Sequence, residues 1–234
     1  MSERGPDLSA RVSLPETIRH LVELDVVKGL LVPNSRVTEE QLSSRYSVSR
    51  TPVREAMRLL EKQGLLVRRG RGVFVAEHST RDEVEVIYLT RHAVESFLTE
   101  RAARVMTQQT LDRLEQTHRE FRRQLTIRKQ PDIPALVQLD SQFHWAIYDA
   151  AGSDLTGIVT SYWGRLQREL ANRVYETSAP VIYADHHEEI LRALREGDSA
   201  AARRFMEHHL AHSSDAILAT YPPALPTPDE EGTT

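Results

Sequence analysis

Four side chains with metal-binding atoms fall on the inward faces of three predicted helices. Asp140 and His144 are four residues apart, so a helix over residues 132–151 places both on one face. His187 and His209 each share an apolar stripe in later helices, predicted over 180–196 and 198–219. Three neutral imidazoles and one carboxylate suit a divalent transition metal, with zinc, nickel and manganese as candidates. Taken singly, an inward histidine is more often a hydrogen-bonded core residue.

A second set of residues is suited to nucleic acid. Arg50, Arg54 and Arg58 are spaced four residues apart and line one face of a helix predicted to run to about Gln63. Another face carries an apolar stripe at helical spacing, made of Val53, Ala56, Met57 and Leu60. Thr51 is expected to cap the start of this helix. A helix buried on one side, with arginines and small hydroxyls at its exposed start, fits the major groove of DNA.

The elements around this helix predict a DNA-binding fold. Helical periodicity over 15–30 and a capping-box pattern over Thr38–Gln41 indicate two helices before it. After it, Gly64 ends the helix, and β-prone runs at 65–69 and 73–75 flank a Gly-Arg-Gly turn. Helix, helix, turn, helix and basic hairpin together make a winged helix-turn-helix.

Charge is unevenly distributed along the chain. Residues 36–72 hold nine Lys or Arg against four acids, a net charge of about +5, whereas the whole chain carries −4. A basic module joined to an acidic one is typical of a DNA reader with a separate sensing or assembly part. The absence of cysteine excludes disulfides and zinc–cysteine sites. With no signal peptide and no apolar run near the ~18 residues of a membrane span, we expect a cytoplasmic protein with no membrane partner.

These patterns divide the chain into two folded domains of a mainly α fold class. The expected parts are a disordered N-terminus (1–9), a winged helix-turn-helix (10–76), a linker (77–80), an all-helical domain (81–220) and a disordered tail (221–234). Six helices are expected in the second domain, over 81–106, 110–129, 132–151, 154–176, 180–196 and 198–219. Such a bundle can enclose a core and leave a pocket between helices.

The run Ser49–Ala56, with the sequence SRTPVREA, resembles the signature of the DNA-binding domain of GntR-family bacterial transcription regulators. The resemblance covers residues ~15–76 and implies contacts with double-stranded operator DNA. The implied contacts from the helix and the turn before it are Arg45, Ser49, Arg50, Thr51 and Arg54, and those from the wing tip are Arg69, Gly70 and Arg71. The chain departs from the family at Asn34 and Ser47, where glycine is usual, and at Glu40, where some relatives have a DNA-contacting arginine.

The spacing of Asp140, His144, His187 and His209 also resembles the metal ligands of the FCD domain, the helical effector-binding domain of the FadR branch. Six helices rather than seven resemble its VanR-type subgroup. The family resemblance favours a metal site over four separate core residues. It also implies that Arg91 pairs with an effector carboxylate, although an ion pair with Glu95 one helical turn later is an equal alternative. The remaining late histidines are expected at the surface, with His212 as a reserve ligand; they are His186, His208 and His212.

We therefore expect a transcription regulator, not an enzyme. It would repress by binding a palindromic operator as a homodimer, and a small organic acid at the metal site would release it. Three alternatives stay open: a metal-dependent, hydrolase-like enzyme, a structural DNA-binding protein without an effector, and a metal sensor that needs no organic effector.

Overall fold

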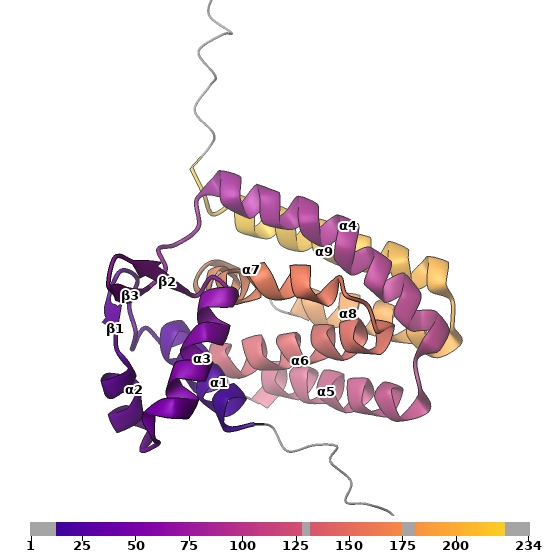
Figure 1. Ribbon diagram of the computed structural model, residues 1–234. Helices are drawn as coiled ribbons and strands as arrows, with labels where there is room; N and C mark the ends of the chain where they lie inside the picture. Colours follow the sequence, from indigo (N-terminus) through magenta and orange to yellow (C-terminus); the bar gives the residue numbers. More distant parts are fainter. Residues whose placement is uncertain (1–12, 128–131, 175–180, 223–234) are drawn as a thin grey trace, which may run out of the picture. The chain divides into compact units, whose positions relative to one another are not determined.

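The structure is a computed structural model that describes residues 13–127, 132–174 and 181–222. It divides into two compact units between Glu77 and His78 (Figure 1). The expected N-terminal segment 1–9 and all but the first two residues of the tail 221–234 lie outside the described residues.

The first unit has the element order expected of a winged helix-turn-helix, with one addition. Its elements are α1 (Leu14–Val27), β1 (Arg36–Val37), α2 (Glu39–Tyr46), α3 (Arg50–Lys62), β2 (Leu66–Arg69) and β3 (Gly72–Val75). The predicted hairpin is β2 and β3, paired antiparallel from Leu66 opposite Val75 to Arg69 opposite Gly72. The short strand β1 was not predicted; it pairs with the other edge of β3, so the sheet order is β1-β3-β2.

Local signals account for the helices of this unit. Thr38 caps α2 in a capping box, with its side chain accepting from the Gln41 amide and the Gln41 side chain accepting from the Thr38 amide. The predicted stripe of α3 is fully confirmed, because Val53, Ala56, Met57 and Leu60 are all buried. The prediction of Thr51 as the cap is wrong: α3 begins two residues earlier, with Ser49 as N-cap and no side-chain capping bond.

The apolar residues that give segment 15–30 its helical periodicity are not all buried. Ile18, Val22 and Val26 are buried, but Leu21 and Leu30 are exposed. Leu30 is exposed because α1 ends at Val27, before that position can join the helix face. Asp25 is buried in the same helix, where it accepts hydrogen bonds from Arg45 and the Tyr46 hydroxyl of α2. Periodicity alone gave no sign of this buried carboxylate.

The second unit is helical, as predicted. Among the described residues its elements are α4 (Arg81–Val105), α5 (Gln108–Ile127), α6 (Ile133–Ala151), α7 (Thr156–Glu169), the π-helical turn η1 (Leu170–Val174), α8 (Val181–Glu196) and α9 (Ser199–Leu218). The six α-helices match the predicted ones to within a few residues; the π-helical turn that continues α7 was not predicted. In the part of the chain that the structure describes, no helix combines the length and apolarity needed to cross a membrane.

The helices of this unit pack so that α6, α8 and α9 share one interior. Helix α9 lies along α4 and also contacts α8, while α5 contacts both α6 and α8 (Figure 1). On α9 the buried positions include Ala202, Met206 and His209. Phe205 on the same helix is only half-buried, and the Arg192 guanidinium lies over its ring.

Candidate metal centre and nucleic-acid interface

The four predicted metal ligands come together in the interior of the helical unit. The carboxylate of Asp140 lies 3.8 Å from His144 Nε2 and 3.5 Å from His187 Nε2. One ring nitrogen from each of His144, His187 and His209 lies within 4.8 Å of the others. All four residues are at least 96% buried. Helices α6, α8 and α9 thus place one acid and three imidazoles around a common point.

The nitrogen atoms of this cluster lack partners that a buried core would supply. His144 Nε2, both ring nitrogens of His187 and His209 Nδ1 are buried with no hydrogen bond in the described residues. Buried polar atoms are nearly always paired, so four such atoms in one cluster indicate a missing ligand. Two imidazoles on one tetrahedral ion at about 2.1 Å have centroids about 5 Å apart. The three ring separations here are 4.9, 5.0 and 5.3 Å, so the residues fit a divalent ion.

Burial also keeps these imidazoles in the form that binds metal. It lowers the pKa of His144, although Asp140 and Glu95 act in the opposite direction. Burial and neighbouring imidazoles together hold the pKa of His187 and His209 well below the usual histidine value. Neutral rings offer lone pairs, and the single carboxylate of Asp140 supplies the negative charge that a cation prefers.

A chain of hydrogen bonds fixes the orientation of His144. The Tyr148 hydroxyl donates to Glu95 Oε2 at 2.6 Å, so it accepts from His144 Nδ1 at 2.9 Å. His144 therefore carries its proton on Nδ1 and presents a bare Nε2 toward Asp140. An outer carboxylate that orients a ligating imidazole in this way is a recurring feature of metal sites.

Arg91 lies at the edge of this network. It forms the ion pair with Glu95 that the sequence offered as an alternative to an effector contact. Its Nε and Nη2 donate to the two Glu95 oxygens at 2.9 and 3.1 Å, with both side chains buried. Glu95 also accepts from the hydroxyls of Tyr148 and Tyr162. Burial alone raises the pKa of Glu95, but the Arg91 charge and hydrogen bonds outweigh it and lower that pKa. The remaining nitrogen, Arg91 Nη1, is buried without a partner in the described residues.

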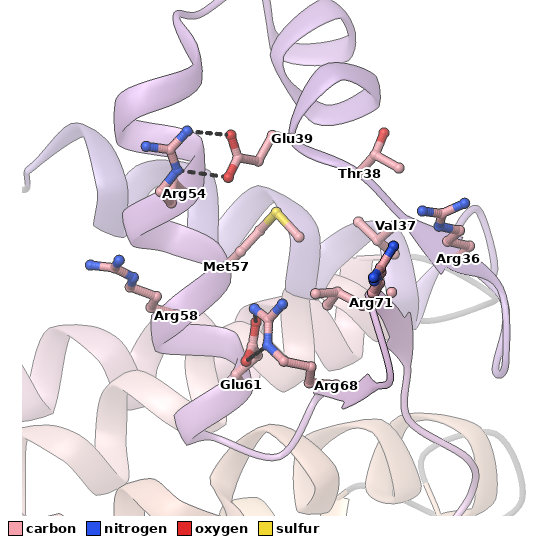
Figure 2. A pocket seen from close by; sticks show the side chains of 12 residues that line it. Arg36, Val37, Thr38, Glu39, Arg54, Met57, Arg58, Glu61, Arg68 and Arg71 are labelled. Atoms are coloured by element: carbon pink, nitrogen blue, oxygen red, sulfur yellow. Dashed lines mark hydrogen bonds and ion pairs between the residues drawn. The ribbon is translucent and has the colours of Figure 1, made fainter.

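The predicted DNA-binding residues line an exposed face of the first unit. Arg54 and Arg50, on α3, both reach back to glutamates at the start of α2 (Figure 2 shows the Arg54 pair). Arg54 donates to both oxygens of Glu39 at 2.7 and 2.9 Å, whereas Arg50 is a looser 3.6 Å from Glu40. These hydrogen bonds lower the pKa of Glu39. Any contact of Arg54 with a base therefore requires it to leave or share the Glu39 carboxylate.

An arginine-lined cavity of about 330 Å³ lies beside this face, between α3 and the sheet (Figure 2). Its walls carry five arginines and two glutamates: Arg36, Arg54, Arg58, Arg68, Arg71, Glu39 and Glu61. Arg68 pairs with Glu61 at 2.6 Å. Arg36, Arg58 and Arg71 make no hydrogen bond or salt bridge within the described residues. Sequence reasoning missed Arg36, because it lies in the unpredicted strand β1.

The other predicted DNA-contacting residues differ in how their side chains are bonded within the protein. At the wing tip, Gly70 has a φ of +57° in the two-residue turn that leads to Arg71. Arg69 bonds the side chains of Asn34 and Glu77. Arg45 donates to the buried Asp25, so it has a structural role in addition to the predicted DNA contact.

Comparison with known proteins identifies both units. Residues 14–75 match the family of bacterial regulatory proteins named gntR, and residues 86–212, more than half of the chain, match the FCD domain. This chain belongs to the GntR family of regulators. Its relatives are transcription regulators and not enzymes, which removes the hydrolase-like alternative.

Curated relatives of this GntR-family regulator match over most of its length. The HTH-type transcriptional repressor RspR of Escherichia coli is 29% identical over 86% of this chain and 88% of its own. The Uxu operon regulator of Haemophilus influenzae is 29% identical over 82% of this chain and 77% of its own. Among solved structures, Escherichia coli McbR/YncC superposes with a TM-score of 0.70 at 23% identity, covering 89% of this chain and 98% of the other.

In this GntR-family regulator two features near the predicted sites escaped sequence reasoning. His186 was expected at the surface but is only 8% exposed, while His208 is exposed and His212 half-buried. The second half of the predicted linker is bound to the helical unit, because the buried carboxylate of Glu169 accepts from the Ser79 amide and contacts His78. Both follow from packing between helices, for which the residue pattern held no signal.

Proposed function

We propose that this protein is a repressor that binds a palindromic operator as a homodimer and is released by a small carboxylate. A divalent ion of zinc, nickel or manganese would be held by Asp140, His144, His187 and His209. The observation that supports this most directly is the buried cluster of four unpartnered imidazole nitrogens in a chain that also carries a recognition helix. When bound, the ion would supply an open coordination position for an anionic oxygen.

Arg91 supports a carboxylate as the effector. Its Nη1 is buried without a partner in the described residues, which leaves one charged donor beside the metal cluster. Arginine recognises carboxylates through such planar N–H groups. The effector would bind the ion with one end and Arg91 Nη1 with an oxygen, while Glu95 keeps the other two nitrogens of the guanidinium.

DNA recognition would use the face built on α3 and the wing. Ser49, Arg50, Thr51 and Arg54 would enter the major groove, and the wing tip at Arg69, Gly70 and Arg71 the minor groove, with Arg45 beside them. The cavity arginines Arg36 and Arg58 are placed to neutralise backbone phosphates.

Two observations support a homodimer. They are the short DNA site that one winged helix-turn-helix can cover and an exposed apolar stripe on α4. One helix-turn-helix covers only a half-site, so affinity for a palindrome requires two copies. On α4, Val86, Leu89 and Phe97 are 61%, 72% and 41% exposed. Their spacing puts them on one face of the helix, together with the exposed Ala93. A second copy of this chain would cover that stripe in a two-fold interface.

The proposal is tested with DNA selected from a random pool by the metal-loaded protein. Fluorescence anisotropy would follow release of that DNA as small carboxylic acids are added one at a time. We expect one acid to weaken DNA binding by about 5- to 150-fold, the usual size of such coupling. Linkage then requires the DNA to weaken binding of the acid by the same factor.

The Arg91→Lys variant distinguishes a loss of effector binding from a loss of folding. It keeps a positive charge against Glu95 but removes the nitrogen assigned to the acid, so DNA binding should persist and the response should vanish. Arg113→Lys makes the same change at an exposed site on α5 and should respond as wild type. A normal response in Arg91→Lys would remove Arg91 from the site, and no response to any acid would contradict the effector.

A metal sensor without an organic effector is the second candidate. The observation in its favour is that Glu95 already occupies two nitrogens of Arg91, as an external carboxylate would. In that case adding or removing the ion alone changes DNA affinity, with no acid present.

A further inference from the structure

Three more imidazoles form a group of their own on the outer side of helices α8 and α9. The ring of His186 on α8 lies 4.6 Å from the ring of His208 and 5.2 Å from that of His212, both on α9. None of the three is among the four predicted ligands, although His212 was expected as a reserve for that set. The ring of His186 also lies 5.9 Å from the ring of His209. His186 is only 8% exposed, His212 is half-buried and His208 is exposed, so the group extends from the packed helix surface to solvent.

The spacing of these rings matches that of ligands on one ion. Imidazoles that share a tetrahedral ion at about 2.1 Å have centroids about 5 Å apart. The separations of 4.6 and 5.2 Å bracket that value, as do the 4.9 to 5.3 Å of the buried cluster. His208 and His212 are four residues apart on a helix, the arrangement that lets two histidines grip one ion from the same face.

A buried atom without a partner gives a second, independent indication. His186 Nδ1 is buried and makes no hydrogen bond in the described residues. Buried polar nitrogens in folded proteins are nearly always paired, so this ring lacks a partner that the chain itself does not supply. The imidazoles of His208 and His212 lie next to it and offer nitrogen atoms that can bind a metal ion.

We propose that His186, His208 and His212 form a second transition-metal site, distinct from the buried centre and open to solvent. Three histidines with water in the fourth position make an open site of the kind that exchanges its ligand. The ring nitrogens are less tightly gathered than those of the buried cluster, which lie within 4.8 Å of one another. Because one side faces water, this site should bind its ion more weakly than the buried one.

The test counts cobalt(II) ions on the full-length chain. Metal-free protein is titrated with Co²⁺ at neutral pH, with the visible absorption of bound Co²⁺ and elemental analysis after gel filtration as readouts. We expect two ions per wild-type chain, a tight one and a weaker one. The His208→Gln/His212→Gln variant should keep the tight ion and lose the weaker one. His208 is exposed and His212 half-buried, so neither change removes a fully buried side chain.

Two further variants make the outcome decisive. His92→Gln removes a half-buried histidine of α4 outside both groups and should still bind two ions. His144→Gln should lose the tight ion and keep the weaker one, which separates this site from the proposed effector site. A single ion on saturated wild type, or two ions on His208→Gln/His212→Gln, would overturn the second site without touching the buried one.

Discussion

At the scale of single residues, the hydrogen bonds of His144 decide which ring nitrogen it would offer to the proposed ion. The Tyr148 hydroxyl accepts a hydrogen bond from His144 Nδ1–H and donates its own hydrogen bond to Glu95, so His144 Nε2 carries no proton. Tyr162 donates to the other oxygen of the same Glu95 but has no bond to His144. The two tyrosines therefore share a carboxylate but differ in whether they touch a metal ligand.

Replacing Tyr148 with Phe should weaken metal binding by about 10- to 100-fold, the usual cost of losing an outer partner of a ligating histidine. His144 would lose the acceptor that fixes its tautomer and its ring orientation. Competition with a chromophoric chelator measures the affinity.

Tyr162→Phe is the matched control, because it deletes one hydroxyl from the same Glu95 without touching His144. It should change metal affinity much less. Equal losses in the two variants would mean that Glu95 acts through its charge alone, and the assigned relay would be wrong.

At the scale of elements, the turns of the DNA-binding unit hold residues in a conformation that favours glycine. Asn34 and Ser47 have φ of +64° and +56°, at the two positions where the family usually has glycine. Asn tolerates the left-handed region better than most residues, but Ser has no such advantage. Ser47 ends α2, directly before the turn into the recognition helix α3, so its strain lies within the reading motif.

Ser47→Gly should therefore stabilise the DNA-binding unit by about 1 kcal/mol, because glycine adopts the left-handed region without the Cβ penalty. Native-state hydrogen exchange of the α3 amides in the full chain measures the free energy of opening. Ser44→Gly, an exposed position inside α2, should instead destabilise by about 1 kcal/mol. A loss of protection in Ser47→Gly would show that the Ser47 backbone is not strained.

At the scale of the whole molecule, the proposed homodimer would decide how the two DNA-binding units are used. Each unit is compact, and the α4 stripe of Val86, Leu89 and Phe97 leaves apolar surface of the helical unit uncovered in a single chain. Exposed apolar residues gathered on one helix face mark interaction surfaces in soluble proteins. A two-fold contact through this stripe would join two helical units and so two recognition helices.

Leu89→Glu should turn the dimer into a monomer at micromolar concentration, because it places a charge in the centre of the proposed interface. Gel filtration with light scattering measures the mass. Val105→Glu is the control: Val105 is 52% exposed on the same helix but lies about a quarter-turn or more from the stripe. A Leu89→Glu protein that stays dimeric would place the interface elsewhere.

The sequence by itself determined the features that depend on residue spacing within one helix, namely its buried face and its two ends. The buried face of α3 and the shared face of Asp140 and His144 follow from a period of 3.6 residues, and the caps and breaks at Thr38 and Gly64 are local. The six helices of the second unit were readable for the same reason, since each is set by its own apolar pattern. The four proposed metal ligands could be predicted because each lies on the inward face of its own helix.

Only the tertiary structure decided which side chains meet across elements. The pair of Arg54 with Glu39, the burial of Asp25 under Arg45, and the third strand β1 join residues with no common periodicity. The burial of His186 likewise depends on how α8 and α9 pack. Such contacts depend on distances between elements and on the need to pair buried polar groups. Neither can be predicted from the spacing of residues along one helix.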